Sequence, residues 1–118
     1  ERIQSQRLDI ARSYVQDCPC TLVLKGAGSI VAAPKETPRL CPQAWSHLAL
    51  GGSGDVLSGL IGTLLARGLD SFSAACLGVF WHACTGRILE TKYPQRGHLA
   101  RDIAHALPPV LELFDKHS

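Results

Sequence analysis

The residues best suited to chemistry stand in a glycine-rich stretch, Leu48–Gly59. Three glycines and a serine directly precede Asp55, and an apolar run with helical spacing follows it. The first turn of a helix carries backbone N–H groups without partners inside the helix, and these groups bind phosphate and other oxyanions. A carboxylate beside such a site is placed to accept a proton from an attacking hydroxyl. The stretch predicts phosphoryl chemistry with Asp55 as the base, although an acid there is also typical of an ordinary helix start.

A second stretch, Lys25–Ser29, places a lysine and two glycines directly after the apolar run Thr21–Leu24. The run predicts a buried strand, parallel to its neighbours and covered on both faces. Ligands of open α/β sheets bind outside the carboxyl ends of the strands, so a lysine at this point could hold a nucleotide. An ordinary hairpin turn with a solvated lysine is the alternative, and the residues alone favour it.

The elements that must position these two stretches follow from the spacing of apolar residues. A helix from 54 to 67, with Gly68 as its stop signal, carries the glycine-rich stretch at its start. Around it the pattern predicts, in chain order, a helix over 1–16, strands over 21–24 and 30–33, an edge strand around 39–41, a helix over 73–91 and a last helix over 100–114, kinked or split at Pro108-Pro109.

Several residues have both a packing and a functional interpretation. The helix over 54–67 is apolar around much of its circumference, which predicts that it is buried. Gly59 and Gly62 inside it indicate close approach to another element, because interior glycine costs up to about 1 kcal/mol relative to alanine. Trp45, His47 and His82 could serve a substrate, but their residue types favour packing.

The composition is that of one globular domain, with 118 residues, 46% of them apolar and 19% charged. The net charge is +2 without a basic run, so no nucleic-acid partner is expected. Charges and glycines interrupt the apolar runs, so no membrane span is expected. The five cysteines lack the spacing of a zinc site, so we name no metal ligand and expect buried free thiols in the cytoplasm. The absence of Met indicates a portion of a longer chain.

Five segments stand in a recognisable order: Val23–Ser29, Gly51–Gly59, Leu64–Leu69, Ala74-Ala75 with His82, and Gly97–Ile103. This order resembles the C-terminal half of the ADP/ATP-dependent NAD(P)H-hydrate dehydratases, which belong to the ribokinase-like superfamily. The combination of Leu-Lys-Gly-Ala-Gly-Ser with Gly-Gly-Ser-Gly-Asp-Val-Leu is far more specific than either motif alone. The resemblance implies a ribokinase-like three-layer α/β/α fold, with residues 1–118 as its C-terminal portion and the N-terminal half outside this chain.

The family repairs nicotinamide cofactors that have been hydrated on the nicotinamide ring. The resemblance therefore implies a lyase acting on hydrated NADH or NADPH, with ADP or ATP and Mg²⁺ phosphorylating the added hydroxyl before phosphate leaves. A homo-oligomer is also expected. Carried over by position, Asp55 assists deprotonation of the hydroxyl. The implied nucleotide-binding residues are Lys25, Gly26, Ala27, Gly28 and Ser29 along the lysine turn, Gly52 and Ser53 in the anion site, and Gly54 at the nucleotide phosphates.

Two other functions fit the same residues. One is a small-molecule kinase of the same superfamily, acting on a vitamin precursor or a sugar, which would use Asp55 but stop after phosphoryl transfer. The other is a non-catalytic module that binds nucleotide or mediates assembly. The segment Ala44–His47 favours this last function, because the family usually carries a Gly-Asn-Pro-Gly-like segment there and Leu50 stands where a small Ser or Thr is usual.

Overall fold

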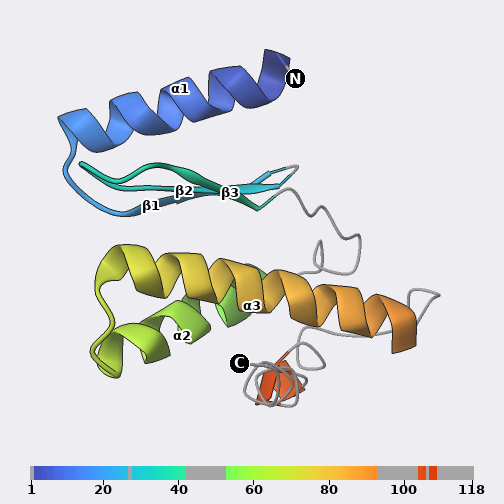
Figure 1. Ribbon diagram of the computed structural model, residues 1–118. Helices are drawn as coiled ribbons and strands as arrows, with labels where there is room; N and C mark the ends of the chain where they lie inside the picture. The colour runs from blue at the N-terminus through green and yellow to red at the C-terminus, as the bar shows by residue number, and fades with distance from the viewer. Residues whose placement is uncertain (1, 27, 42–52, 93–103, 106, 109–118) are drawn as a thin grey trace.

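A computed structural model describes residues 2–26, 28–41, 53–92, 104–105 and 107–108. The elements are, in order, α1 (Arg2–Asp17), β1 (Leu22–Leu24), β2 (Ser29–Ala32), β3 (Arg39–Cys41), α2 (Ser53–Ala66) and α3 (Ser71–Lys92). They form three layers, with α1 on one face of the sheet and α2 with α3 on the other (Figure 1). The α/β/α arrangement implied by the resemblance is therefore confirmed.

The sheet has three strands in the order β1-β2-β3, and both neighbouring pairs are antiparallel. The prediction that the run 21–24 forms a parallel strand is wrong for the described part of the chain. Its neighbour β2 follows after only the four residues from Lys25 to Gly28, and a parallel connection needs a crossover of about a dozen residues or more. The edge strand predicted around 39–41 is confirmed as β3.

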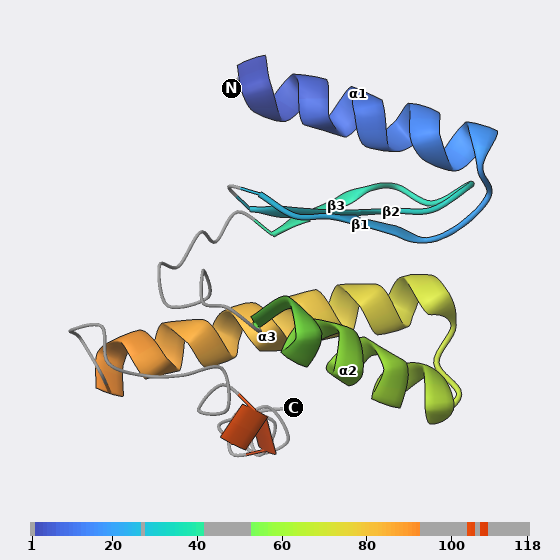
Figure 2. The same cartoon turned by 180° about the vertical axis from the view of Figure 1, so that it is seen from behind.

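The strand β2 is covered on both faces, because its successive side chains point to opposite sides of the sheet. Ile30 and Ala32, each 1% exposed, pack against Ala11 and Val15 of α1. The residue between them, Val31, packs on the opposite side in a cluster with Leu57, Ala75 and Val79 from α2 and α3. One short strand thus contributes to a hydrophobic cluster on each face of the sheet, and Figure 2 shows the helical layers on either side of it.

The turn between α2 and α3 is defined at both ends by local signals. Gly68 has φ +99°, and its amide donates to the carbonyl of Leu65 at 3.0 Å, so the predicted stop signal is confirmed. The carboxylate of Asp70 then caps α3, accepting the Ser73 amide at 2.9 Å and the Ser73 hydroxyl at 2.8 Å. These signals are local in sequence, which is why the end of α2 and the start of α3 were predicted to within two residues, at 67 and 73 against the observed Ala66 and Ser71.

Two predictions about α2 are wrong. The helix is half-buried rather than buried all round, since Leu65 is 44% exposed and Ser58, Gly59 and Gly62 are exposed as well. Gly59 and Gly62 have no described atom within 4 Å of a β-carbon added to them. The close approach comes instead from Gly78 of α3, where a β-carbon would lie 2.6 Å from Cγ1 of Ile61.

The chain after α3 is described at a few positions only. The indole Nε1 of Trp81 donates to the carbonyl of Leu107 at 2.8 Å, which ties α3 to this later segment. Most of the predicted helix over 100–114 lies outside the described residues. Among the described helices, none combines the length and hydropathy needed to cross a membrane.

Candidate anion-binding site

The two chemistry-bearing stretches meet in space. Lys25 directly follows β1, and Gly54 lies in the first turn of α2. A β-carbon added to Gly54 would stand 2.9 Å from the ammonium nitrogen Nζ of Lys25. Residue 54 therefore has to be small for Lys25 to reach the start of α2. The hairpin interpretation of Lys25–Ser29 is correct for the backbone, but the lysine side chain is directed at the helix.

The local electrostatics favour an anion. The start of α2 presents unpaired N–H groups with a partial positive charge, equivalent to roughly half an elementary charge. The Lys25 ammonium adds a full positive charge at the same place. In the described part of the chain, no carboxylate forms an ion pair with Lys25. Two positive groups of this kind, side by side and open to solvent, suit a phosphate oxygen.

Asp55 lies next to this positive pair. It is exposed in the first turn of α2 and directly follows Gly54. Ser53 is the first residue of the same helix. A carboxylate at this position stays accessible to a substrate hydroxyl that approaches the start of the helix.

The other described members of the lysine turn differ in exposure. Gly26 is exposed, Gly28 is buried with φ +91°, and Ser29 begins β2 as a half-buried residue. The positive φ suits glycine, because a side chain there would be strained. Ala27 and Gly52 lie outside the described residues, as do Trp45, His47 and the segment 44–47.

Sequence reasoning missed Arg7. Its Nη2 donates to the carbonyl of Gly28 at 2.8 Å and to that of Leu24 at 3.2 Å, so it holds both sides of the lysine turn. A signal existed in the sequence: Arg7 precedes Ala11 and Val15 at helical spacing, on the stripe of α1 that faces the sheet. An arginine in line with buried apolar residues faces the sheet, so its guanidinium is expected to bond to groups there.

His82 is only 5% exposed on α3, which agrees with the packing interpretation.

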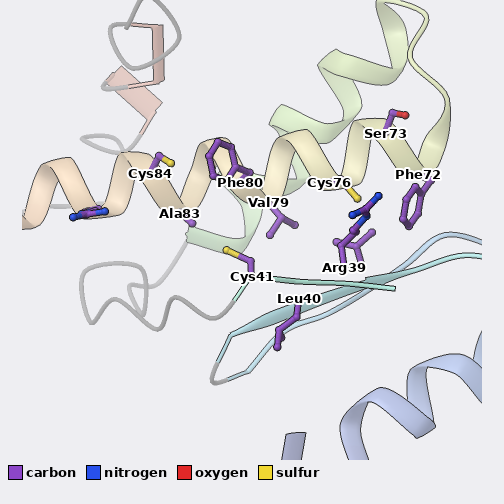
Figure 3. Close-up of a pocket in the computed structure, with 12 residues that line it drawn as sticks. Arg39, Leu40, Cys41, Phe72, Ser73, Cys76, Val79, Phe80, Ala83 and Cys84 are labelled. Carbon is purple, nitrogen blue, oxygen red and sulfur yellow. The ribbon is translucent and has the colours of Figure 1, made fainter. Parts of the chain in front are cut away.

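A cavity of about 610 Å³ lies away from the anion site, between β3 and α3, and none of the predicted site residues lines it. Figure 3 shows Cys41 on the β3 side of this cavity and Cys76 and Cys84 on the α3 side. Burial raises the pKa of the Cys76 and Cys84 thiols, so both stay protonated and weakly nucleophilic at neutral pH.

All five cysteines are free, but the expectation that they are buried is wrong: Cys18 is exposed, and the other four are half-buried. Within the described ranges, no cluster of three or more His, Cys, Asp or Glu side chains has the geometry to hold a metal ion. Of the predicted site residues, Gly54 and Asp55 lie in the first turn of α2, and the Lys25 ammonium reaches that turn.

Comparison with known proteins places this chain in a family. A family model described as NAD(P)H-hydrate dehydratase matches residues 1–109. The bifunctional NAD(P)H-hydrate repair enzyme Nnr of Escherichia coli K12 is 38% identical over 117 residues, which is 98% of this chain and 23% of that protein. The ADP-dependent (S)-NAD(P)H-hydrate dehydratase of Xanthomonas campestris is 34% identical over 116 residues, covering 93% of this chain and 38% of that protein.

Solved structures agree with the sequence relatives. The ADP/ATP-dependent NAD(P)H-hydrate dehydratase of Bacillus subtilis, co-crystallised with ATP and Mg²⁺, superposes with a TM-score of 0.84 at 29% identity. That match covers 95% of this chain and 40% of the other. Bacillus subtilis YxkO gives a TM-score of 0.86 at 28% identity. The chain thus spans between about a quarter and two fifths of the length of these proteins.

Proposed function

This chain belongs to the NAD(P)H-hydrate dehydratase family, and we propose that the protein carrying it is a lyase that restores NADH and NADPH from their hydrated forms. The observation that carries the proposal is the approach of Lys25 to the start of α2, within 2.9 Å of a β-carbon placed on Gly54. It turns two motifs that are separate in sequence into one anion site with an acid beside it.

The residues at this site fit an adenine nucleotide. An ammonium beside an open helix start can hold the phosphates of ADP or ATP, and the relatives named above are ADP-dependent or were crystallised with ATP and Mg²⁺. We assign phosphate contact to Lys25, Gly54 and the backbone N–H groups of Gly52 and Ser53. The remaining residues of the turn, Gly26, Ala27, Gly28 and Ser29, line the rest of the nucleotide. A bound nucleotide would supply the phosphoryl group, and Mg²⁺ would neutralise phosphate charge.

Asp55 is the assigned base. Its exposed carboxylate accepts the proton of the hydroxyl that hydration adds to the nicotinamide ring, which makes that oxygen a nucleophile. Attack of this oxygen on the terminal phosphorus would break the P–O bond of the nucleotide and release AMP from ADP or ADP from ATP. The ring C–O bond would then break and phosphate would depart, a far better leaving group than hydroxide, while the adjacent ring carbon loses a proton to solvent so that the double bond forms. Lys25 and the helix start stabilise the negative charge that collects on the phosphate oxygens. The hydroxyl is lost and the reduced nicotinamide is restored.

The rest of the proposal concerns the longer protein that contains this chain, its assembly and its location. Residues 1–118 would be the C-terminal portion of one ribokinase-like domain, since the related proteins are much longer than this chain. Further substrate contacts would come from the N-terminal half of that domain, and the assembled protein would be a homo-oligomer. Five free thiols support a cytoplasmic location, where cysteines stay reduced.

The test is an assay of the intact protein with hydrated NADH and either ADP or ATP in Mg²⁺. We expect the absorbance of the reduced nicotinamide to rise in step with release of inorganic phosphate. A stable phosphorylated product without phosphate release would identify a small-molecule kinase instead. Nucleotide binding without any turnover would identify a non-catalytic module.

A further inference from the structure

The β1–β2 turn that carries Lys25 is held from the other side of the sheet. α1 lies on the face opposite to α2 and α3 (Figures 1 and 2). From α1, Nη2 of Arg7 reaches the carbonyl oxygens of Leu24 and Gly28 at 3.2 and 2.8 Å. These two carbonyls flank the segment from Lys25 to Ala27. One guanidinium nitrogen therefore bridges the two ends of the turn.

The turn is also shaped to receive this guanidinium. A β-carbon on Gly26 would stand 3.0 Å from Nη2 and 3.2 Å from Cζ of Arg7, which is tighter than ordinary contact. Glycine at 26 thus leaves room for the arginine to lie flat against the backbone. Hydrogen bonds from a charged donor are stronger than neutral ones, so the bridge resists opening of the turn.

The position of Lys25 depends on this bridge. Its backbone is part of the turn that Arg7 closes, and its side chain extends to the first turn of α2. We propose that Arg7 is a positioning residue, which orients the lysine turn so that the Lys25 ammonium stands at the anion site and thereby sets the affinity for the nucleotide. The inference rests on the proposed function, because it deepens the account of the same site. Arg7 acts through the turn, whose two ends it bonds.

The matched pair of variants is Arg7→Met and Arg12→Met in the intact protein. Arg12 lies on the same helix, is exposed, and borders a different hollow near Ala33 and Pro38. We expect Arg7→Met to raise the dissociation constants for ADP and ATP, and the KM for the nucleotide, about tenfold, with a much smaller change in kcat. Arg12→Met should leave all of these unchanged. Arg7→Lys keeps a cation that can donate to both carbonyls, and it should recover part of the affinity.

A purely structural role predicts a different outcome. If Arg7→Met only reduces the folded fraction, kcat falls while KM and the dissociation constant stay at wild-type values, and that result overturns the inference.

The two proposals fail separately. A folded wild-type protein that binds neither ADP nor ATP contradicts the proposed function and the role of Arg7 together. A wild type that binds nucleotide, beside an Arg7→Met variant that binds it equally well, contradicts the role of Arg7 alone.

Discussion

Nζ of Lys25 lies 2.9 Å from the point where a β-carbon on residue 54 would stand. This relationship joins the turn after β1 to the first turn of α2 and creates a site with two positive groups. Glycine at 54 is what permits the approach. A hairpin turn and a helix start are each common structures. The anion site arises because the two meet here.

The first prediction concerns Gly54. Gly54→Val places a side chain where the Lys25 ammonium lies, so the lysine must withdraw from the helix start. Loss of a hydrogen bond to a charged group costs about 1.5–3 kcal/mol, so nucleotide binding should weaken by about tenfold or more. Titration calorimetry of the intact protein with ADP and ATP measures this.

Gly59→Ala is the matched control, because it lies on the same helix and a β-carbon there meets no described atom within 4 Å. It should leave binding unchanged and stabilise the helix by up to about 1 kcal/mol. Equal affinities for Gly54→Val and wild type would contradict the placement of the phosphates at this helix start.

The second prediction separates chemistry from binding at Asp55. Asp55→Ala and Asp55→Asn both remove the base, and general base catalysis contributes about 10²–10⁴-fold, so kcat should fall by that order. The nucleotide dissociation constant should change little, because the assigned phosphate contacts come from Lys25 and the helix start. Steady-state assays and calorimetry on the same samples give the two numbers. Asp55 is wrongly assigned if the rate survives either substitution.

The third prediction concerns the packing of α2 on α3. A β-carbon on Gly78 would stand 2.6 Å from Cγ1 of Ile61, so Gly78→Ala overpacks the contact. We expect a loss of about 1–3 kcal/mol in the free energy of unfolding. Ile61→Ala opens the space again, and the double variant should therefore be more stable than the sum of the single effects predicts.

Gly62→Ala serves as the control for this contact. It is also a helical glycine, but its added β-carbon meets no described atom within 4 Å, so it should be neutral or slightly stabilising in denaturant unfolding. A Gly78→Ala variant as stable as Gly62→Ala would show that α2 and α3 pack less closely than the structure indicates.

The fourth prediction is a pH dependence at the start of α3. Hydrogen bonds from the Ser73 amide and then the Ser73 hydroxyl lower the pKa of Asp70 below its usual value of about 3.9. A carboxyl with a lowered pKa in the folded state stabilises the fold above its unfolded pKa, and this contribution is lost as pH falls through the folded pKa. Asp70→Ala should therefore lower Tm near neutral pH, and its difference from wild type should shrink below about pH 4.

Thermal unfolding followed by circular dichroism between pH 2 and 7, roughly the range over which carboxyl groups titrate, gives this difference directly. Asp9→Ala is the control, since Asp9 is an exposed carboxylate on a different helix, α1. A difference between Asp70→Ala and wild type that stays constant down to the lowest pH would mean that the cap does not depend on the charge of Asp70.

The elements and the identity of the motifs were determined by the sequence alone. Helix ends at Gly68 and Asp70, the edge strand Arg39–Cys41 and the glycine-rich helix start at Gly54 all follow from local signals, because capping and turn geometry depend on residues a few positions apart. The family resemblance also follows from the sequence, since it depends on the order and spacing of residues.

Only the tertiary structure decided which elements touch. That Lys25 reaches Gly54, that Arg7 bridges Leu24 and Gly28, and that Gly78 rather than Gly59 makes the close helix contact are all facts about segments far apart in the chain. The antiparallel pairing of β1 with β2, by contrast, was already indicated by the short turn between them, although the apolar run suggested a parallel strand. Local propensity describes each element separately, whereas contacts depend on how the layers pack, and that packing places the lysine at the helix start.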